Sequence, residues 1–192
     1  MSSQSSAETA HPLASELLAF VARQPLSGPV LEVGTGSGRN TRALVAANVQ
    51  VVPVPDDVPY TQLPGARDSY GAALSTHAYL HGTFDKLRAG MAELRRVLRP
   101  DAPIFITLGS IRDARYGLGI PFDDRSFAPG DGDEAGIPHV YLDRDGVLEL
   151  VRGFFTVQAA EEVEADATVG RWAHASADAA GRVHWFVRAV RQ

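Results

Sequence analysis

The sequence has 192 residues, of which 45% are hydrophobic, a formal net charge of -5 and no cysteine. This is enough for one domain with a substantial core. One lysine and scattered arginines give no footprint for nucleic acid, and the lack of cysteine excludes disulfides and thiolate metal sites. No apolar run reaches the roughly 20 residues of a membrane span and the first residues lack a signal-peptide pattern, so we expect no membrane partner and a cytoplasmic location.

The N-terminal part is predicted to contain a polar tail and one helix. Residues 1–10 are rich in serine and are expected to be disordered, with a single domain over 11–192. Four apolar residues then recur at helical spacing up to Pro25: Leu13, Leu17, Leu18 and Val21. Such a helix either covers a bound ligand or only closes the core.

A strand, a glycine loop and a helix are predicted next, over residues 29–47. Val30, Leu31 and Val33 form an apolar run typical of a buried parallel strand. Glycines at every second position, from 34 to 38, then force a sharp turn before helical periodicity begins. Backbone N–H groups at the start of that helix, together with its dipole, suit the loop to holding a ligand.

The spacing of the glycines narrows the choice of ligand. A dinucleotide fingerprint requires a third glycine at position 39, where the chain has Arg39, so a nicotinamide dehydrogenase is disfavoured. No lysine follows in the arrangement of a nucleoside triphosphate loop. The remaining pattern is an acidic residue followed by three alternating glycines, from Glu32 to Gly38. It is found either in a ligand loop or in a tight turn of an ordinary α/β sheet.

This pattern resembles motif I of the class I S-adenosylmethionine-dependent methyltransferases, in which the glycines lie against the methionine part of the cofactor. The resemblance implies an α/β fold, a Rossmann-like sheet flanked by helices with strand order 3-2-1-4-5-7-6, and S-adenosyl-L-methionine as cofactor. Carried over to this sequence, the cofactor-binding residues are Glu32, Gly34, Thr35, Gly36, Gly38, Asn40, Asp56, Asp57, Ser75 and Thr76.

The second strand, predicted over 49–54, contains Pro53, which cannot donate to a strand ladder and so indicates a sheet edge. The acidic residue that the family usually places after this strand falls on Pro55. Asp56 and Asp57 follow at once. They either bind the ribose hydroxyls, as carboxylates can, or form a solvated turn.

The interval before the next strand, predicted over 70–75, is too short for the helix B and strand three that the family usually has there. We therefore expect both to be missing, which exposes strand two and removes a wall of the adenine site. Either Tyr60 or Leu63 stacks on the base instead, or the chain has a weak affinity for the cofactor. The exposed edge also suggests a homodimer.

His77 and His81 follow this strand at a spacing that places both on one face if the segment is helical. The resemblance puts the methyl-transfer site here, and an imidazole suits a general base or an orienting group. The spacing is also that of a metal-ligand pair. Because no third ligand lies nearby in sequence, no metal is predicted.

The remaining elements are a helix that ends at Pro100, a strand over 103–108, a long insertion, a helix capped by Asp143, and two terminal strands predicted to form an antiparallel hairpin. The insertion, 109–141, is rich in Gly, Pro and Asp and is predicted to be irregular and to serve as a substrate lid. Its acidic run at 130–134 lacks the spacing of a calcium loop and is interpreted as a turn. Three lid residues are predicted to contact the acceptor: Arg115, Tyr116 and His139.

The predicted reaction is in-line displacement, in which a lone pair of a small-molecule substrate attacks the methyl group of the sulfonium. Alignment of the two reactants supplies most of the acceleration in such a reaction. The alternative is a protein of the same fold that has lost methyl transfer, either a binding module or an enzyme that uses the cofactor differently. The missing elements and Pro55 motivate that alternative.

Overall fold

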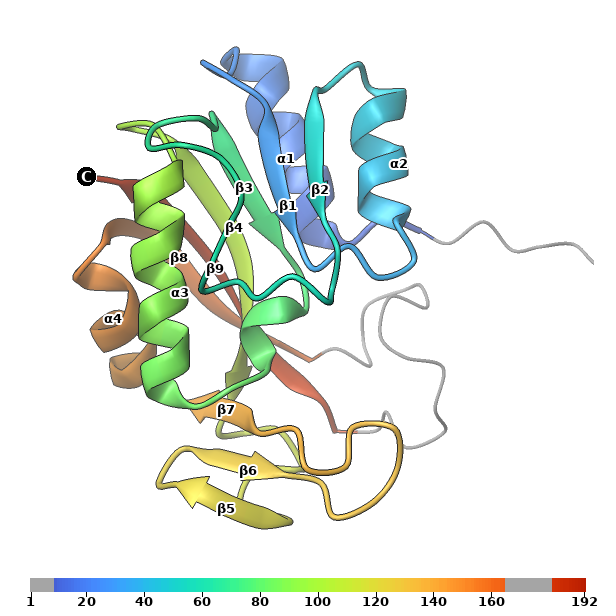
Figure 1. Cartoon of the computed structure of the whole chain (residues 1–192), viewed down its shortest axis with the longest axis vertical. Coiled ribbons are helices and arrows are strands. Elements are labelled where there is room, and N and C mark those ends of the chain that lie inside the picture. Colours follow the sequence, from blue (N-terminus) through green and yellow to red (C-terminus); the bar gives the residue numbers. More distant parts are fainter. Residues whose placement is uncertain (1–8, 165–180) are drawn as a thin grey trace, which may run out of the picture.

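A computed structural model of the chain describes residues 9–164 and 181–192. A central sheet is flanked by helices on both faces (Figure 1). The strands are β1 (Val30–Val33), β2 (Val51–Val54), β3 (Ala72–Ser75), β4 (Pro103–Ser110), β5 (Ile120–Asp123), β6 (Ser126–Ala128), β7 (His139–Leu142), β8 (Phe155–Glu164) and β9 (Val183–Arg191). The helices are α1 (Pro12–Arg23), α2 (Arg39–Ala46), the short 3-10 helix η1 (Ala78–Leu80), α3 (Phe84–Val97) and α4 (Arg144–Arg152).

The parallel strands β2, β1, β3 and β4 lie side by side in that order, and every residue of β1 and β3 is buried. Alternation along β1 divides the core into two parts. Val30 packs with α1 and α2 on one face, while Leu31 and Val33 pack with α3 and α4 on the other. The strand is buried on both faces because its residues are apolar on both, apart from Glu32.

The edge predicted at the second strand is confirmed. Among the described strands β2 pairs with β1 alone, and Pro53 lies opposite Glu32. Residues 55–71, all of them described, contain no helix and no strand, only an isolated bridge from Tyr70 to Leu98. The helix and strand expected to be missing are therefore absent. A homodimer through this edge stays a prediction.

The opposite side of the sheet confirms the terminal hairpin and corrects the expectation for the insertion. β9 runs antiparallel to both β4 and β8. The insertion 109–141 is not irregular throughout, because β7 pairs in parallel with the last two residues of β4 and extends the sheet through β6 to β5 (Figure 1). These strands have three or four residues each, too few for a periodic pattern.

Two segments discussed from the sequence lie wholly or largely outside the described residues. Residues 1–8 of the predicted disordered tail lie outside the described residues, and so does most of the polar stretch between the last two strands. Within the described ranges, no helix combines the length and the apolar character that crossing a membrane requires.

Candidate functional site

The glycine loop joins the carboxyl end of β1 to α2 and has the conformation that its sequence predicts. Gly34, Gly36 and Gly38 have φ values of 74°, 48° and 76°, a left-handed region that other residues enter at a cost. A Cβ on Gly34 would lie 2.9 Å from the Cβ of Ala78, whereas a Cβ on Gly36 would meet no atom within 4 Å. The loop is therefore packed against η1 on one side and open above Gly36.

A buried carboxylate lies beneath this loop. Glu32 is only 1% exposed, and its Oε2 accepts a hydrogen bond from the Thr41 hydroxyl. Its Oε1 is also buried and has no hydrogen-bond partner among the described residues. Burial raises the pKa of Glu32, against the opposing effects of the Thr41 hydroxyl, the Asn40 amide and the positive charge of Arg39. A buried acceptor without a partner is costly, so this oxygen suits a ligand that carries a donor.

The two aspartates after β2 differ in their surroundings. Asp56 Oδ1 accepts a hydrogen bond from the Gly36 amide at 3.4 Å, so its carboxylate lies at the loop. Asp57 is exposed, and within residues 9–164 and 181–192 no hydrogen bond joins it to the loop. Of the two, Asp56 is the better placed to bind the ribose, although the ribose contact itself stays a prediction.

Three other predicted cofactor residues form an internal network. The amide of Asn40 donates to Thr76 Oγ1 at 3.2 Å and accepts from the His11 backbone at 2.9 Å. The Ser75 hydroxyl donates to the carbonyl of Val33 at 2.8 Å. These bonds tie α1, the start of α2 and the end of β3 to the strand before the loop. The residues thus support the loop from below, and direct contact with the cofactor stays a prediction for them, as it does for Thr35.

Tyr60 and Leu63 do not take the place of the missing adenine wall. They are 6% and 4% exposed and pack in the core beside α3. The Tyr60 ring lies 4.7 Å from that of Tyr79, and its hydroxyl donates to the His81 carbonyl at 2.5 Å. The expectation that either stacks on the base is therefore wrong. The physical reason is that residues 55–71 cover α3 with their own apolar side chains.

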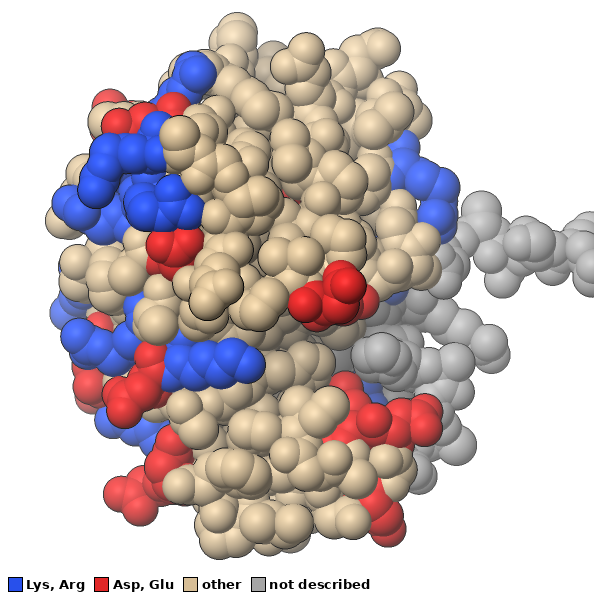
Figure 2. Space-filling model, viewed as in Figure 1, with Lys and Arg blue, Asp and Glu red and all other residues tan. Residues whose placement is uncertain are grey.

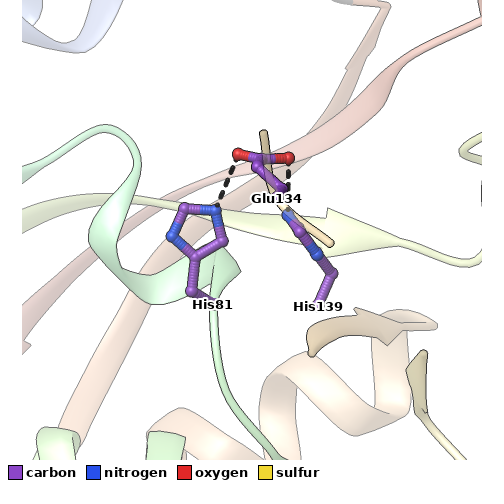
Figure 3. Close-up of side chains that lie close together, drawn as sticks. All are labelled: His81, Glu134 and His139. Carbon is purple, nitrogen blue, oxygen red and sulfur yellow. Dashed lines mark ion pairs between the residues drawn. The ribbon is translucent and has the colours of Figure 1, made fainter. Parts of the chain in front are cut away.

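The two predicted catalytic histidines are separated by η1 and do not share a helix face. His77 is the residue before this single turn and His81 the residue after it, so the assumed helical spacing does not apply. The structure instead brings His81 to His139 and Glu134 in the insertion (Figure 3). Glu134 Oε1 lies 3.3 Å from His81 Nε2, and its Oε2 lies 3.2 Å from His139 Nε2.

Glu134 is the residue of this group that sequence reasoning missed. It ends the acidic run at 130–134, which was interpreted as a turn, and the structure does place turns there. The hydrogen bonds from His139 and His81 hold the pKa of Glu134 far below its usual range. The only signal in the sequence was a carboxylate five residues before a histidine in a predicted lid.

The other two predicted lid residues have mainly structural contacts. Arg115 is paired with the buried carboxylate of Asp113, with Nε 3.0 Å from Oδ1, and Asp113 also accepts from the Val183 amide. The Tyr116 ring packs at 5.6 Å from Phe127. Acceptor contacts of Arg115 and Tyr116 stay predictions.

The surface over β5 and β6 is mostly uncharged, whereas basic side chains gather over α3 and α4 (Figure 2).

No family model matches the sequence, and no curated protein matches it either. Several solved structures are similar to this chain in fold. A methyltransferase of Methanosarcina mazei, described as SAM-dependent, has a TM-score of 0.66 at 13% identity, covering 95% of this chain and 98% of its own. The 1,6-didemethyltoxoflavin-N1-methyltransferase of Burkholderia thailandensis, solved with its substrate and S-adenosylhomocysteine, has a TM-score of 0.65 at 18% identity, covering 95% and 77%.

A protein with a different reaction is also similar. The [4+2]-cyclase SpnF has a TM-score of 0.55 at 18% identity, covering 92% of this chain and 80% of its own. At these identities the likeness concerns the fold, and a fold does not determine a reaction. The strand order, the glycine loop after β1 and these neighbours agree. The chain has the fold of the class I S-adenosylmethionine-dependent methyltransferases.

Proposed function

We propose that the chain binds S-adenosyl-L-methionine at the glycine loop and transfers its methyl group to a small-molecule acceptor. The observation that carries this proposal is the buried Glu32 Oε1, which has no partner among the described residues, beneath a loop of three left-handed glycines. These residues fit the cofactor, because an acceptor below and bare backbone above suit a ligand with an amino group and a slender methionine chain. When bound, the cofactor supplies a methyl group activated on a sulfonium.

The protein groups then have the tasks of binding and alignment. In this proposal Gly34 and Gly36 let the backbone approach the ligand, and Glu32 accepts from its donor group. Asp56, which follows β2, binds the ribose; its hydrogen bond from the Gly36 amide supports this role. His81 lies beyond η1 at the same carboxyl edge of the sheet, where it is positioned to orient the acceptor. Support for His81 over His77 comes from its contact with the insertion.

A small molecule is the proposed acceptor. The Burkholderia neighbour was solved with such a substrate, and a geranyl diphosphate C-methyltransferase of Streptomyces coelicolor, with a TM-score of 0.60, was solved with a diphosphate ligand. The formal net charge of -5 does not favour a polyanionic macromolecule as the acceptor. The structural extension β5 to β7 flanks the edge where the acceptor would bind.

The variant Gly36→Ala tests the cofactor site. Alanine at φ 48° either strains the backbone by about 1–2 kcal/mol or relaxes the loop, and its methyl group enters the open side of the loop. We expect S-adenosylmethionine and S-adenosylhomocysteine to bind the wild-type chain and to bind the variant at least about tenfold more weakly, as measured by isothermal titration calorimetry.

The matched control is Gly117→Ala. Gly117 has φ 77° and, like Gly36, no atom within 4 Å of an added Cβ, but it lies in the insertion. It should therefore show the same backbone strain with unchanged binding of both ligands. If the wild-type chain binds neither ligand, or if both variants bind equally well, the glycine loop is not the cofactor site and the proposal fails.

A protein of this fold without methyl transfer remains the second candidate. Residues 55–71 lack the usual helix and strand, and Pro55 stands where the family has an acid, so the adenine end of the site has fewer walls. The similarity to a cyclase shows that the fold serves another reaction. Failure of both ligands to bind in the calorimetric experiment would favour this candidate.

A further inference from the structure

Three side chains that are distant in the sequence converge at the carboxyl edge of the sheet: His81, Glu134 and His139. One ligand atom from each lies within 4.8 Å of the others. The two imidazole rings stand nearly perpendicular, at 87°, with centroids 4.6 Å apart, and both point at the carboxylate of Glu134 (Figure 3). The His139 side chain is 4% exposed, whereas those of His81 and Glu134 are 31% and 28% exposed, so the cluster is closed behind and open in front.

The backbone holds the two histidines in place. His81 and His139 form an isolated antiparallel bridge, and the Gly82 amide donates to the Pro138 carbonyl at 2.6 Å. The Tyr60 hydroxyl donates to the His81 carbonyl. Through these bonds the segment after η1 is fastened to the start of β7. The cluster is therefore built into the fold and does not depend on a chance encounter of surface side chains.

A hydrogen bond to the backbone fixes the orientation of the buried His139 imidazole. His139 Nδ1 lies 2.9 Å from the Ile137 carbonyl, which can only accept, so Nδ1 carries a hydrogen. Nε2 then faces Glu134 Oε2 at 3.2 Å. Nε2 is therefore the nitrogen of His139 that is directed at the cluster and can coordinate a metal ion. A metal-bound histidine usually donates its other N–H in this way.

The distances suit a metal ion. Two ligand atoms that are each about 2.0–2.1 Å from a tetrahedral zinc ion lie about 3.3–3.4 Å apart. The contacts from Glu134 to the histidines measure 3.3 Å from Oε1 and 3.2 Å from Oε2, so each carboxylate oxygen lies at this spacing from one imidazole nitrogen. One ligand atom from each of the three residues lies within 4.8 Å of the others. Two imidazoles and one carboxylate are the ligands of several catalytic zinc and iron(II) sites, whereas magnesium and calcium prefer oxygen alone.

We propose that His81, Glu134 and His139 bind one divalent transition-metal ion of the zinc type, with at least one coordination position left open. Three protein ligands and an open front are the arrangement of sites that bind a substrate atom on the metal. The metal site does not depend on the proposed function, but its role does: an oxygen or nitrogen of the acceptor binds at the open position and is oriented toward the methyl group.

Zinc binding tests the proposal directly. Wild-type chain treated with EDTA and dialysed is titrated with zinc chloride by calorimetry, and cobalt(II) is added in a parallel sample to give a ligand-field absorption spectrum. We expect one zinc ion per chain, no competition by magnesium, and at least about 100-fold weaker binding by His81→Ala, Glu134→Gln and His139→Ala, because the loss of an outer partner alone costs 10–100-fold.

The control is His77→Ala, which removes a neighbouring histidine outside the cluster and should leave zinc binding unchanged. Glu134→Gln keeps the size of the side chain, so circular dichroism of this variant should match the wild type. Absence of saturable zinc binding, or equal binding by the wild type and the three cluster variants, overturns the proposal. In that case the cluster is a hydrogen-bonded group of one carboxylate and two imidazoles without a metal.

Failure of this proposal can be distinguished from failure of the cofactor site. Gly36→Ala should bind S-adenosylmethionine at least about tenfold more weakly and bind zinc as the wild type does, since the loop contributes no ligand to the cluster. Glu134→Gln should show the reverse pattern. A chain that binds the cofactor but no metal retains the proposed function and loses only the metal site.

Discussion

Gly109→Ala should destabilise the protein by about 3 kcal/mol or more, although it adds a single methyl group. Gly109 lies near the end of β4, between β7 and β9. An added Cβ would lie 2.3 Å from the Val140 carbonyl oxygen, far inside contact distance. Because this obstacle is backbone, it cannot move without breaking the parallel pairing of β4 with β7. Urea unfolding, with the midpoint and slope compared with the wild type, measures the loss.

The control for this prediction is Gly153→Ala, at the end of α4. Gly153 has helical backbone angles and no atom within 4 Å of an added Cβ, so the substitution should change stability by less than about 0.5 kcal/mol. A Gly109→Ala variant as stable as this control would show that β7 is not paired with β4. Since His139 begins β7, displacement of this strand should also weaken zinc binding.

The parts of the fold that the sequence predicted are those determined by local pattern. The run from Val30 to Val33, the alternating glycines and the following helix lie next to one another in the chain, so their spacing alone defines a strand, a loop and a helix. Pro53 marked the edge strand because its missing N–H has the same effect in any context. The absence of a helix and a strand before β3 was predicted because too few residues separate β2 from β3.

Contacts between distant segments were not predictable in the same way. The pairing of β7 with β4 depends on where the insertion returns to the sheet, and no residue of these short strands encodes that return. Tyr60 had two possible partners, a ligand or the core, and the nearby Gly90 decided the outcome by leaving room on α3: a Cβ there would lie 2.5 Å from the Tyr60 ring. The sequence shows a glycine in a helix but not what fills the space beside it.

In the candidate site, too, residues close together in the sequence were predicted and contacts between distant segments were not. Glu32 and the glycines were found from one continuous motif, and the structure places Asp56 beside them. The group of His81, Glu134 and His139 was not found, because its members come from two segments that only the folded chain brings together. The spacing of His77 and His81 suggested a pair, yet a single 3-10 turn between them removes the helical geometry on which that pair depended.

Acidification from pH 7 to pH 5 should lower the free energy of unfolding by about 3–4 kcal/mol through two buried histidines. Burial lowers the pKa of His11 to about 2 and that of His184 to about 4, with positive charge at Arg39 adding to the effect on His11. Both values lie below the unfolded value of 6.5. The unfolded chain therefore binds more protons, and stability present above pH 6.5 is lost as the pH falls, by up to about 1.4 kcal/mol per unit for each histidine.

The structure gives a specific reason for His11. It precedes α1, and its Nδ1 accepts a hydrogen bond from the Leu13 amide at 3.1 Å, which requires a neutral ring. His11→Asn keeps a capping acceptor that does not titrate. This variant should be less stable at pH 7, because the ring packs 5.0 Å from that of Phe186, yet it should lose only about 2 kcal/mol between pH 7 and pH 5. Urea unfolding in EDTA at several pH values gives, for the wild type and for the variant, the slope of the free energy of unfolding against pH. Equal slopes for the wild type and the variant would mean that His11 is protonated within the fold and does not cap α1 as a neutral ring.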